Sequence, residues 1–216
     1  MKNYLSCMKE YWNERFGGEG RIWGSEPSTT AIQALNMFQQ KPTTTVLVPG
    51  SGYGRNSKLF SDAGFEVTGI EISSEAITLA RLYDFHSKFF CASFMDISLA
   101  KESYDAIYCF NVLHLFRQHE RSLFVQKCHH ALKKGGVAFF VVFSDLETSF
   151  GKGQQVETNT FESKPGRPVH YYTEQDLKIQ FDLFSIIDTG IAEDSENHGN
   201  EGPHIHIVRY IVVEKI

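Results

Sequence analysis

The stretch VLVPGSGYGRNS, residues 46–57, decides how the chain folds. Its apolar, partly β-branched beginning predicts a short buried strand over residues 45–48. Glycines follow at alternate positions, Gly50, Gly52 and Gly54, where they permit a positive φ and let a ligand approach the backbone closely. A helical pattern of apolar residues comes next. Strand, glycine turn and helix together predict the nucleotide-binding opening of a doubly wound α/β domain, with the ligand at the carboxyl end of the strand.

A second predicted strand, residues 66–71, ends in the carboxylate of Glu71. Glu71 follows the first glycine by about twenty residues, the spacing at which an acid reaches ribose hydroxyls in such domains. The turn differs from the dinucleotide pattern G-x-G-x-x-G, because the third glycine comes one residue early and Arg55 takes its place. A dinucleotide oxidoreductase is therefore not expected.

The composition is that of an ordinary globular protein. The chain has 216 residues, of which 42% are hydrophobic and 22% charged, and this suits one domain with a sizeable core. Its net charge of -5 provides no basic surface for a nucleic-acid backbone. The N-terminus is polar, and no apolar run approaches the ~20 residues of a membrane span. We therefore expect a cytoplasmic protein without a nucleic-acid or membrane partner.

Strand and helix patterns alternate along the chain. Strands are predicted over residues 45–48, 66–71, 88–92, 104–110, 137–143, 184–189 and 205–213, and helices over 1–16, 28–40, 54–63, 74–86, 117–132 and 174–179. This alternation predicts a parallel sheet with helices on both faces. The polar, glycine-containing stretch 144–168 is interpreted as a long loop near the carboxyl end of the fifth strand. We expect a single domain, 1–216, with a helical cap, 1–43, and a cofactor-binding core, 44–216.

Five motifs occur in an order and spacing that resemble the class I S-adenosylmethionine-dependent methyltransferases. They are VLVPGSGYGRNS, VTGIEIS, FMDI, YDAIYCFNVLH and LKKGG. The GRNS segment and the C-terminal ENH…GPH are similar to the tellurite-resistance branch of this superfamily. The VPGSG turn and the N-terminal Trp12 and Trp23-Gly-Ser-Glu-Pro are similar to the thiol, halide and thiopurine branch.

This resemblance implies a Rossmann-like, seven-stranded, mostly parallel sheet with an antiparallel last strand. It also implies S-adenosylmethionine as cofactor and S-adenosylhomocysteine as product. In that family pattern Gly50, Ser51 and Gly52 would line the methionine end of the cofactor, and Phe110 and Asn111 would lie beside the sulfonium. Glu71 would hold both ribose hydroxyls, with Ile72 against the adenine. Asp96 would accept from the adenine amino group, with Met95 and Ile97 as its neighbours.

The chain departs from the family pattern at two positions. Many members have an aspartate two residues before the first glycine, where this chain has Val48. The tellurite-resistance group pairs a histidine with a following arginine. His198 matches that histidine, but Gly199 replaces the arginine. The resemblance thus implies a catalytic role for His198 and leaves the cofactor's amino group without a direct acid partner.

His198, His204 and His206 are the sharpest candidates for contact with a substrate. Alternatively they belong to a polar surface loop that leads into an edge strand. His204 and His206 would share one strand face, which suits a metal. However, no carboxylate or cysteine is spaced to complete a zinc set, so no metal is expected.

Four further side chains are candidates for a role in the site. Trp23 is expected to close over the sulfonium by cation–π attraction, whereas Trp12 fits the apolar stripe of the first helix. Arg55 either contacts an anionic ligand or is solvated. His114, at a strand end, either lines the pocket or packs in the core.

Methyl transfer is an in-line displacement, so the protein mainly aligns the reactants and excludes water. A protonated oxygen or nitrogen acceptor needs a base, and the sequence identifies none. We therefore expect a small-molecule acceptor with a soft nucleophile, a thiol or a chalcogen oxyanion such as tellurite. The alternatives are an oxygen or nitrogen acceptor and a cofactor-binding sensor or pseudo-enzyme. The oligomeric state stays open.

Overall fold

The protein's computed structural model describes residues 4–197 and 203–216. The helices are α1 (Tyr4–Glu19), α2 (Thr29–Gln39), α3 (Arg55–Asp62), α4 (Ser74–Tyr83), α5 (Gln118–Ala131) and α6 (Glu174–Gln180), with a short 3-10 turn η1 (Leu113–Leu115). The strands are β1 (Thr45–Pro49), β2 (Glu66–Glu71), β3 (Lys88–Cys91), β4 (Tyr104–Phe110), β5 (Leu132–Phe143), β6 (Gln154–Glu157), β7 (Thr160–Lys164), β8 (Arg167–His170), β9 (Ser185–Asn197) and β10 (Pro203–Glu214).

The main sheet has the order β3-β2-β1-β4-β5-β10-β9, which makes seven strands among the described residues. Strands β1 to β5 pair in parallel, and β10 is antiparallel to both β5 and β9. Strand β9 therefore runs in the direction of the first five, and β10 alone is reversed. This confirms the predicted doubly wound, Rossmann-like sheet with an antiparallel last strand. The strand order reverses direction between β1 and β4, where such sheets bind their ligands.

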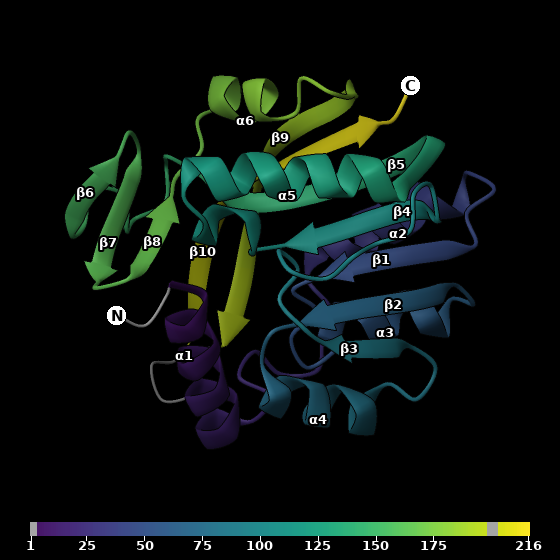
Figure 1. The fold of residues 1–216 in the computed structure, drawn as a ribbon, viewed down its shortest axis with the longest axis horizontal. Coiled ribbons are helices and arrows are strands. Elements are labelled where there is room, and N and C mark those ends of the chain that lie inside the picture. The colour runs from purple at the N-terminus through teal and green to yellow at the C-terminus, as the bar shows by residue number, and fades with distance from the viewer. Residues whose placement is uncertain (1–3, 198–202) are drawn as a thin grey trace.

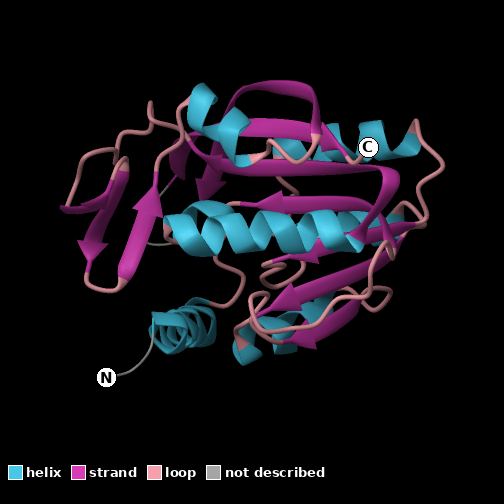
Figure 2. Ribbon diagram, turned by 45° about the horizontal axis from the view of Figure 1, so that its top comes forward, coloured by secondary structure: helices cyan, strands magenta, loops and turns pink. Residues whose placement is uncertain are grey.

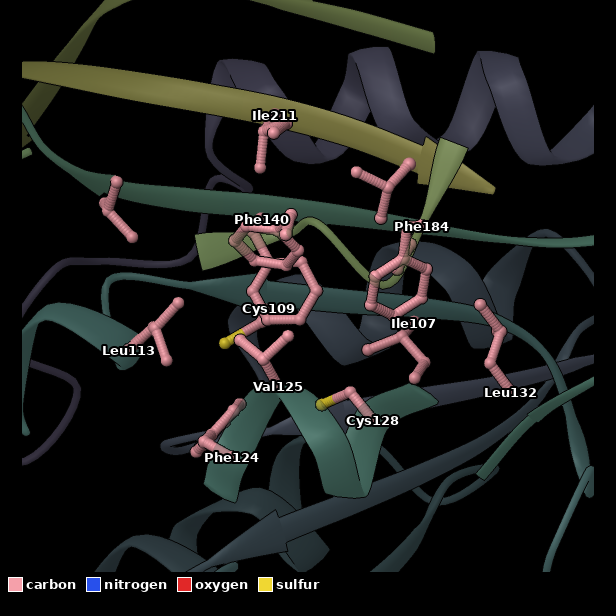
Figure 3. Packing of buried hydrophobic residues seen from close by; sticks show 14 of the residues in the cluster. Ile107, Cys109, Leu113, Phe124, Val125, Cys128, Leu132, Phe140, Phe184 and Ile211 are labelled. Atoms are coloured by element: carbon pink, nitrogen blue, oxygen red, sulfur yellow. The ribbon is translucent and has the colours of Figure 1, made fainter. Parts of the chain in front are cut away.

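Apolar side chains cover both faces of the sheet, so helices pack on each face (Figure 2). Helices α5 and α6 bury one face, where Phe124, Val125 and Cys128 of α5 meet the strands (Figure 3). Helices α2 and α3 bury the other face. Ser28 is the N-cap of α2, because its side chain accepts from the N–H of Ala31.

Stretch 144–168 was interpreted as a loop, and this is wrong. Strands β6, β7 and β8 form a small antiparallel sheet, three-stranded in the described part of the chain. The glycines and prolines of this stretch occupy its turns and edges. An ion pair between Arg117 and Glu162, 2.7 Å long, ties the small sheet to the start of α5. Figure 1 shows that this sheet and α1 lie beyond the carboxyl ends of β1, β2 and β4.

The polar stretch 193–204 was expected to connect two shorter strands. Instead β9 and β10 extend into it as a two-stranded ribbon on either side of residues 198–202. Only the part of β10 from Val208 onward pairs with β5. The ribbon therefore projects past Phe143, the carboxyl end of β5, and carries His204 and His206 to the ligand-binding edge of the sheet.

Among residues 4–197 and 203–216 there is no helix whose length and hydropathy would let it cross a membrane.

Candidate active site

A cavity of about 320 Å³ lies at the carboxyl edge of the parallel strands. It falls within the size range of small-molecule sites, about 300–1,000 Å³. Its wall contains most of the residues predicted to bind the cofactor, namely Gly50, Ser51, Gly52, Glu71, Ile72, Phe110, Asn111 and Trp23. Helix α1 and strand β8 complete the wall with Arg15 and Arg167, among others. The sequence therefore located the cavity, and the structure adds the elements that close it.

The glycine turn needs glycine for two reasons. Gly50, Gly52 and Gly54 all have positive φ, at 64°, 55° and 86°, as expected. A Cβ on Gly50 would also overlap the side chain of Val112. Next to Gly52 the nearest atom to a Cβ would be Phe16 Cζ, at 3.8 Å. The side chain of Val112 therefore fills the space beside Gly50, whereas the space beside Gly52 has room for a ligand.

The Glu71 carboxylate holds this turn from the neighbouring strand. Its Oε2 accepts from the Gly52 N–H at 3.0 Å and its Oε1 from the Ser73 N–H at 2.8 Å. Each carboxylate oxygen has two lone pairs, so both keep capacity for a second donor. Burial raises the pKa of the Glu71 carboxyl, and backbone hydrogen bonds, that of Ser73 first, offset part of the rise.

This raised pKa predicts that cofactor affinity falls as the pH is lowered. Ribose hydroxyls donate to a carboxylate, whereas a protonated carboxyl accepts them less well. Since burial raises the pKa of Glu71 above that of a free glutamate, the loss of affinity begins at a higher pH than the titration of a solvent-exposed glutamate would give. Calorimetry with S-adenosylhomocysteine between about pH 8 and pH 5 measures this effect. Glu71→Gln should remove the dependence, and a flat profile for the unaltered protein would contradict the role of Glu71.

Met95, Asp96 and Ile97 form the turn after β3 but do not line the cavity. The Asp96 side chain is exposed. Lys127 Nζ fixes the turn by donating to the carbonyls of Met95 and Ile97, at 2.8 and 2.7 Å. Phe94, just before them, contributes to the cavity wall instead. The role of Asp96 therefore stays a prediction.

Three buried polar side-chain atoms on the cavity wall have no hydrogen-bond partner in the described part of the protein. They are Ser51 Oγ, Asn111 Oδ1 and Trp23 Nε1. Asn111 is moreover held at a φ of 54°, a conformation that is uncommon outside glycine. Leaving a buried polar group unpaired costs about 1–3 kcal/mol. Three such atoms belong to residues on the wall of one cavity, a place where a polar ligand can supply missing hydrogen bonds.

Aromatic side chains form one wall of the cavity. Trp23 stacks on Tyr53, with ring centroids 6.1 Å apart, and meets Trp12 and Phe16 at 6.1 and 5.9 Å. Both tryptophans line the cavity, so Trp12 belongs to the helix stripe and to the wall at once. Arg55, expected as a solvated side chain or a ligand contact, is buried in this wall and donates to the Trp23 carbonyl.

His114 lines the same cavity and is also buried. Of the two alternatives, lining the pocket and packing in the core, the structure therefore shows both. Its Nδ1 accepts from the Phe143 N–H at 3.3 Å, which places the ring proton on Nε2. Burial lowers the pKa of His114 to about 3, so the ring is neutral at physiological pH.

Glu147 is the residue that sequence reasoning missed. It follows β5, and its Oε1 lies 3.4 Å from Nδ1 of His206, which lines the cavity. His204 stands beside His206, with ring centroids 4.5 Å apart, which confirms their shared face. Burial pushes the pKa of Glu147 upward, but hydrogen bonds from His206 and from the Ile207 N–H lower it overall. His198, the predicted catalytic residue, lies outside the described residues.

Comparison with known protein families finds a matching domain in the centre of the chain. Residues 47–140 match the family described as a methyltransferase domain. A curated relative, the ubiquinone biosynthesis O-methyltransferase of Hydrogenovibrio crunogenus, is 26% identical over 149 residues. That match covers 65% of this chain and spans only 58% of the relative's length.

Solved structures share the fold over most of the chain. One, from work on the conversion of a disulfide bond into a thioacetal group in echinomycin biosynthesis, superposes with a TM-score of 0.78 at 18% identity, covering 96% of this chain and 91% of the other. The 1,6-didemethyltoxoflavin-N1-methyltransferase of Burkholderia thailandensis, with S-adenosylhomocysteine bound, has a TM-score of 0.73 at 18% identity and covers 98% and 88%. Magnesium protoporphyrin IX methyltransferase from Synechocystis PCC 6803, with S-adenosylmethionine bound, reaches 0.71 at 16% identity and covers 100% and 99%.

Residues 47–140 thus match a methyltransferase domain. The strand order belongs to a fold that the chain shares with solved methyltransferases, two of which hold S-adenosylmethionine or S-adenosylhomocysteine.

Proposed function

We propose that this protein transfers the methyl group of S-adenosylmethionine to a small, largely apolar acceptor. The observation that carries the proposal is the set of unpartnered buried atoms, Ser51 Oγ, Asn111 Oδ1 and Trp23 Nε1, around one cavity at the carboxyl edge of the sheet. Such atoms need a polar ligand, and the cavity lies where class I methyltransferases hold their cofactor. S-adenosylmethionine supplies a methyl group made electrophilic by its sulfonium.

The cofactor roles expected from the sequence fit the arrangement of the wall. The turn at Gly50, Ser51 and Gly52 would receive the methionine end, since the backbone at Gly52 is open to the cavity. Glu71 would hold the ribose hydroxyls with its remaining lone pairs, and Ile72 would contact the adenine. Trp23 would face the sulfonium, whose positive charge an aromatic ring attracts.

The acceptor would occupy the part of the cavity away from the glycine turn. Its wall there is mostly apolar, with Leu115, Phe116, Phe143 and Val169. This apolar lining suits an organic molecule, whereas a strongly hydrated oxyanion such as tellurite would have to exchange its water for contacts with few polar side chains, among them Arg167 and His206. An acceptor of the tellurite kind is therefore the weaker form of the proposal.

The expectation of a soft nucleophile depended on the lack of a base. His206 now brings an imidazole to the cavity, with the Glu147 carboxylate beside it, and this pair could assist the removal of a proton from an acceptor hydroxyl. The curated relative, an O-methyltransferase, also supports oxygen as the acceptor atom. We therefore propose a hydroxyl acceptor first and a thiol second.

Transfer of a labelled methyl group tests the proposed function. We expect the purified protein to move labelled methyl from S-adenosylmethionine to apolar hydroxyl compounds, and faster than to tellurite. Glu71→Ala serves as a variant with weakened cofactor binding. Cofactor binding without transfer to any hydroxyl, thiol or amine would instead favour a sensor or pseudo-enzyme.

A further inference from the structure

We propose that Glu147, His204 and His206 bind a divalent transition-metal cation at the acceptor side of the cavity. The proposal deepens the proposed function and depends on it only for the use of the cation. Cation binding itself is measured without cofactor or acceptor.

The three side chains come together from distant parts of the chain. Glu147 follows β5, whereas His204 and His206 lie two residues apart on the part of β10 that projects beyond β5. One potential ligand atom from each side chain lies within 4.8 Å of those of the other two. Two ligands bound at about 2.1 Å with tetrahedral angles are about 3.4 Å apart. Glu147 Oε1 and His206 Nδ1 are 3.4 Å apart and already have this separation.

The donor set selects the kind of cation. Two imidazoles with one carboxylate suit zinc, iron, cobalt or nickel better than magnesium or calcium, which prefer oxygen ligands. Three protein ligands leave at least one coordination position open, as in catalytic rather than structural zinc sites. A cation held here could therefore also bind a small molecule.

The carboxylate is already oriented for this purpose. Glu147 Oε2 accepts from the backbone N–H of Ile207 at 2.6 Å, which leaves Oε1 facing the histidines. The Glu147 side chain is only 1% exposed. Buried carboxylates normally occur with a charged partner or a metal. A hydrogen bond from the backbone to a ligating carboxylate is the usual second layer of a metal site.

The position of His206 connects the site to the acceptor. Its ring lines the cavity and stacks on Phe143, with centroids 4.9 Å apart. An acceptor hydroxyl that reached the cation would have its pKa lowered, so that its proton could leave to water before transfer. The cation would thus supply the activation that an oxygen acceptor needs.

Titration with Co²⁺ tests the site, since bound Co²⁺ is visible in the absorption spectrum and its binding heat is measurable. We expect the metal-stripped protein to bind one equivalent. Glu147→Gln, His204→Ala and His206→Ala should each weaken binding by at least tenfold, because each removes a ligand. His86→Ala, which removes an exposed histidine elsewhere in the described chain, should bind like the unaltered protein. Equal affinity in all four variants, or no binding at all, would overturn the proposal.

Two readouts separate this inference from the proposed function. His204 is exposed and Glu147→Gln keeps an acceptor for Ile207, so these variants should fold. They should also bind S-adenosylhomocysteine as the unaltered protein does. Cofactor binding without Co²⁺ binding would refute the cation site and leave the proposed function intact. Co²⁺ binding without cofactor binding would support the cation site and refute the proposed function.

Discussion

Replacing Glu71 with alanine is expected to weaken S-adenosylhomocysteine binding by more than tenfold. Hydrogen bonds to a charged group are worth about 1.5–3 kcal/mol each, and two ribose hydroxyls would be affected. The same change removes the acceptor for the Gly52 N–H, so the glycine turn also loses its support from β2. Calorimetry on the variant and on the unaltered protein gives the ratio of dissociation constants.

Two controls separate the ribose contact from support of the turn. Glu66→Ala removes an exposed glutamate at the other end of β2 and should leave binding unchanged. A cofactor analogue without ribose hydroxyls should bind the unaltered protein weakly. Glu71→Ala should bind the analogue and S-adenosylhomocysteine about equally, because the two changes remove the same interaction. Full additivity of the two losses would show that Glu71 does not hold the ribose.

Replacing Gly50 with alanine is expected to lower the free energy of unfolding and to abolish cofactor binding. A residue with a side chain at a φ of 64° costs about 1–2 kcal/mol. The overlap of the new Cβ with Val112 adds about 1–3 kcal/mol, as overpacking does elsewhere. Chemical denaturation gives the stability change, and calorimetry gives the loss of binding.

Gly64→Ala is the matched control for this change. Gly64 also has a positive φ, 92°, but a Cβ there would meet no atom within 4 Å. Gly64→Ala should therefore lower the free energy of unfolding only by the cost of a positive φ, and it should leave cofactor binding unchanged. Adding Val112→Ala to Gly50→Ala should restore part of the stability relative to the sum of the single changes. Equal destabilisation by Gly50→Ala and Gly64→Ala would contradict the predicted overlap.

Local patterns were sufficient for the main sheet and for the end of the cavity at the glycine turn. Three features of the site are short-range in sequence: the glycine turn, the acid that ends β2 and the polar residue after β4. Each lies at the end of a strand that a run of apolar residues predicts. Parallel strands bring their carboxyl ends to one edge. Gly50, Glu71 and Asn111 therefore meet there although they are far apart in sequence.

The opposite end of the cavity, where we propose that the acceptor binds, depends on contacts that no local pattern contains. Glu147 meets His206 only because β10 inserts beside β5 and projects beyond it. The small sheet consists of short strands separated by glycines, which look like a loop when neighbouring strands are not known. The same limit applies to Leu123, an apolar residue that is exposed on α5, because tertiary packing decides which side of a weakly amphipathic helix is buried.

Calorimetric binding of S-adenosylmethionine and S-adenosylhomocysteine, with NADH as the control ligand, tests the central claim most directly. We predict micromolar dissociation constants for the first two ligands and no binding of NADH. The glycine turn, Glu71 and the unpartnered atoms of Ser51, Asn111 and Trp23 are the reasons for this prediction. Failure to bind either S-adenosyl compound, or equal binding of NADH, would contradict it.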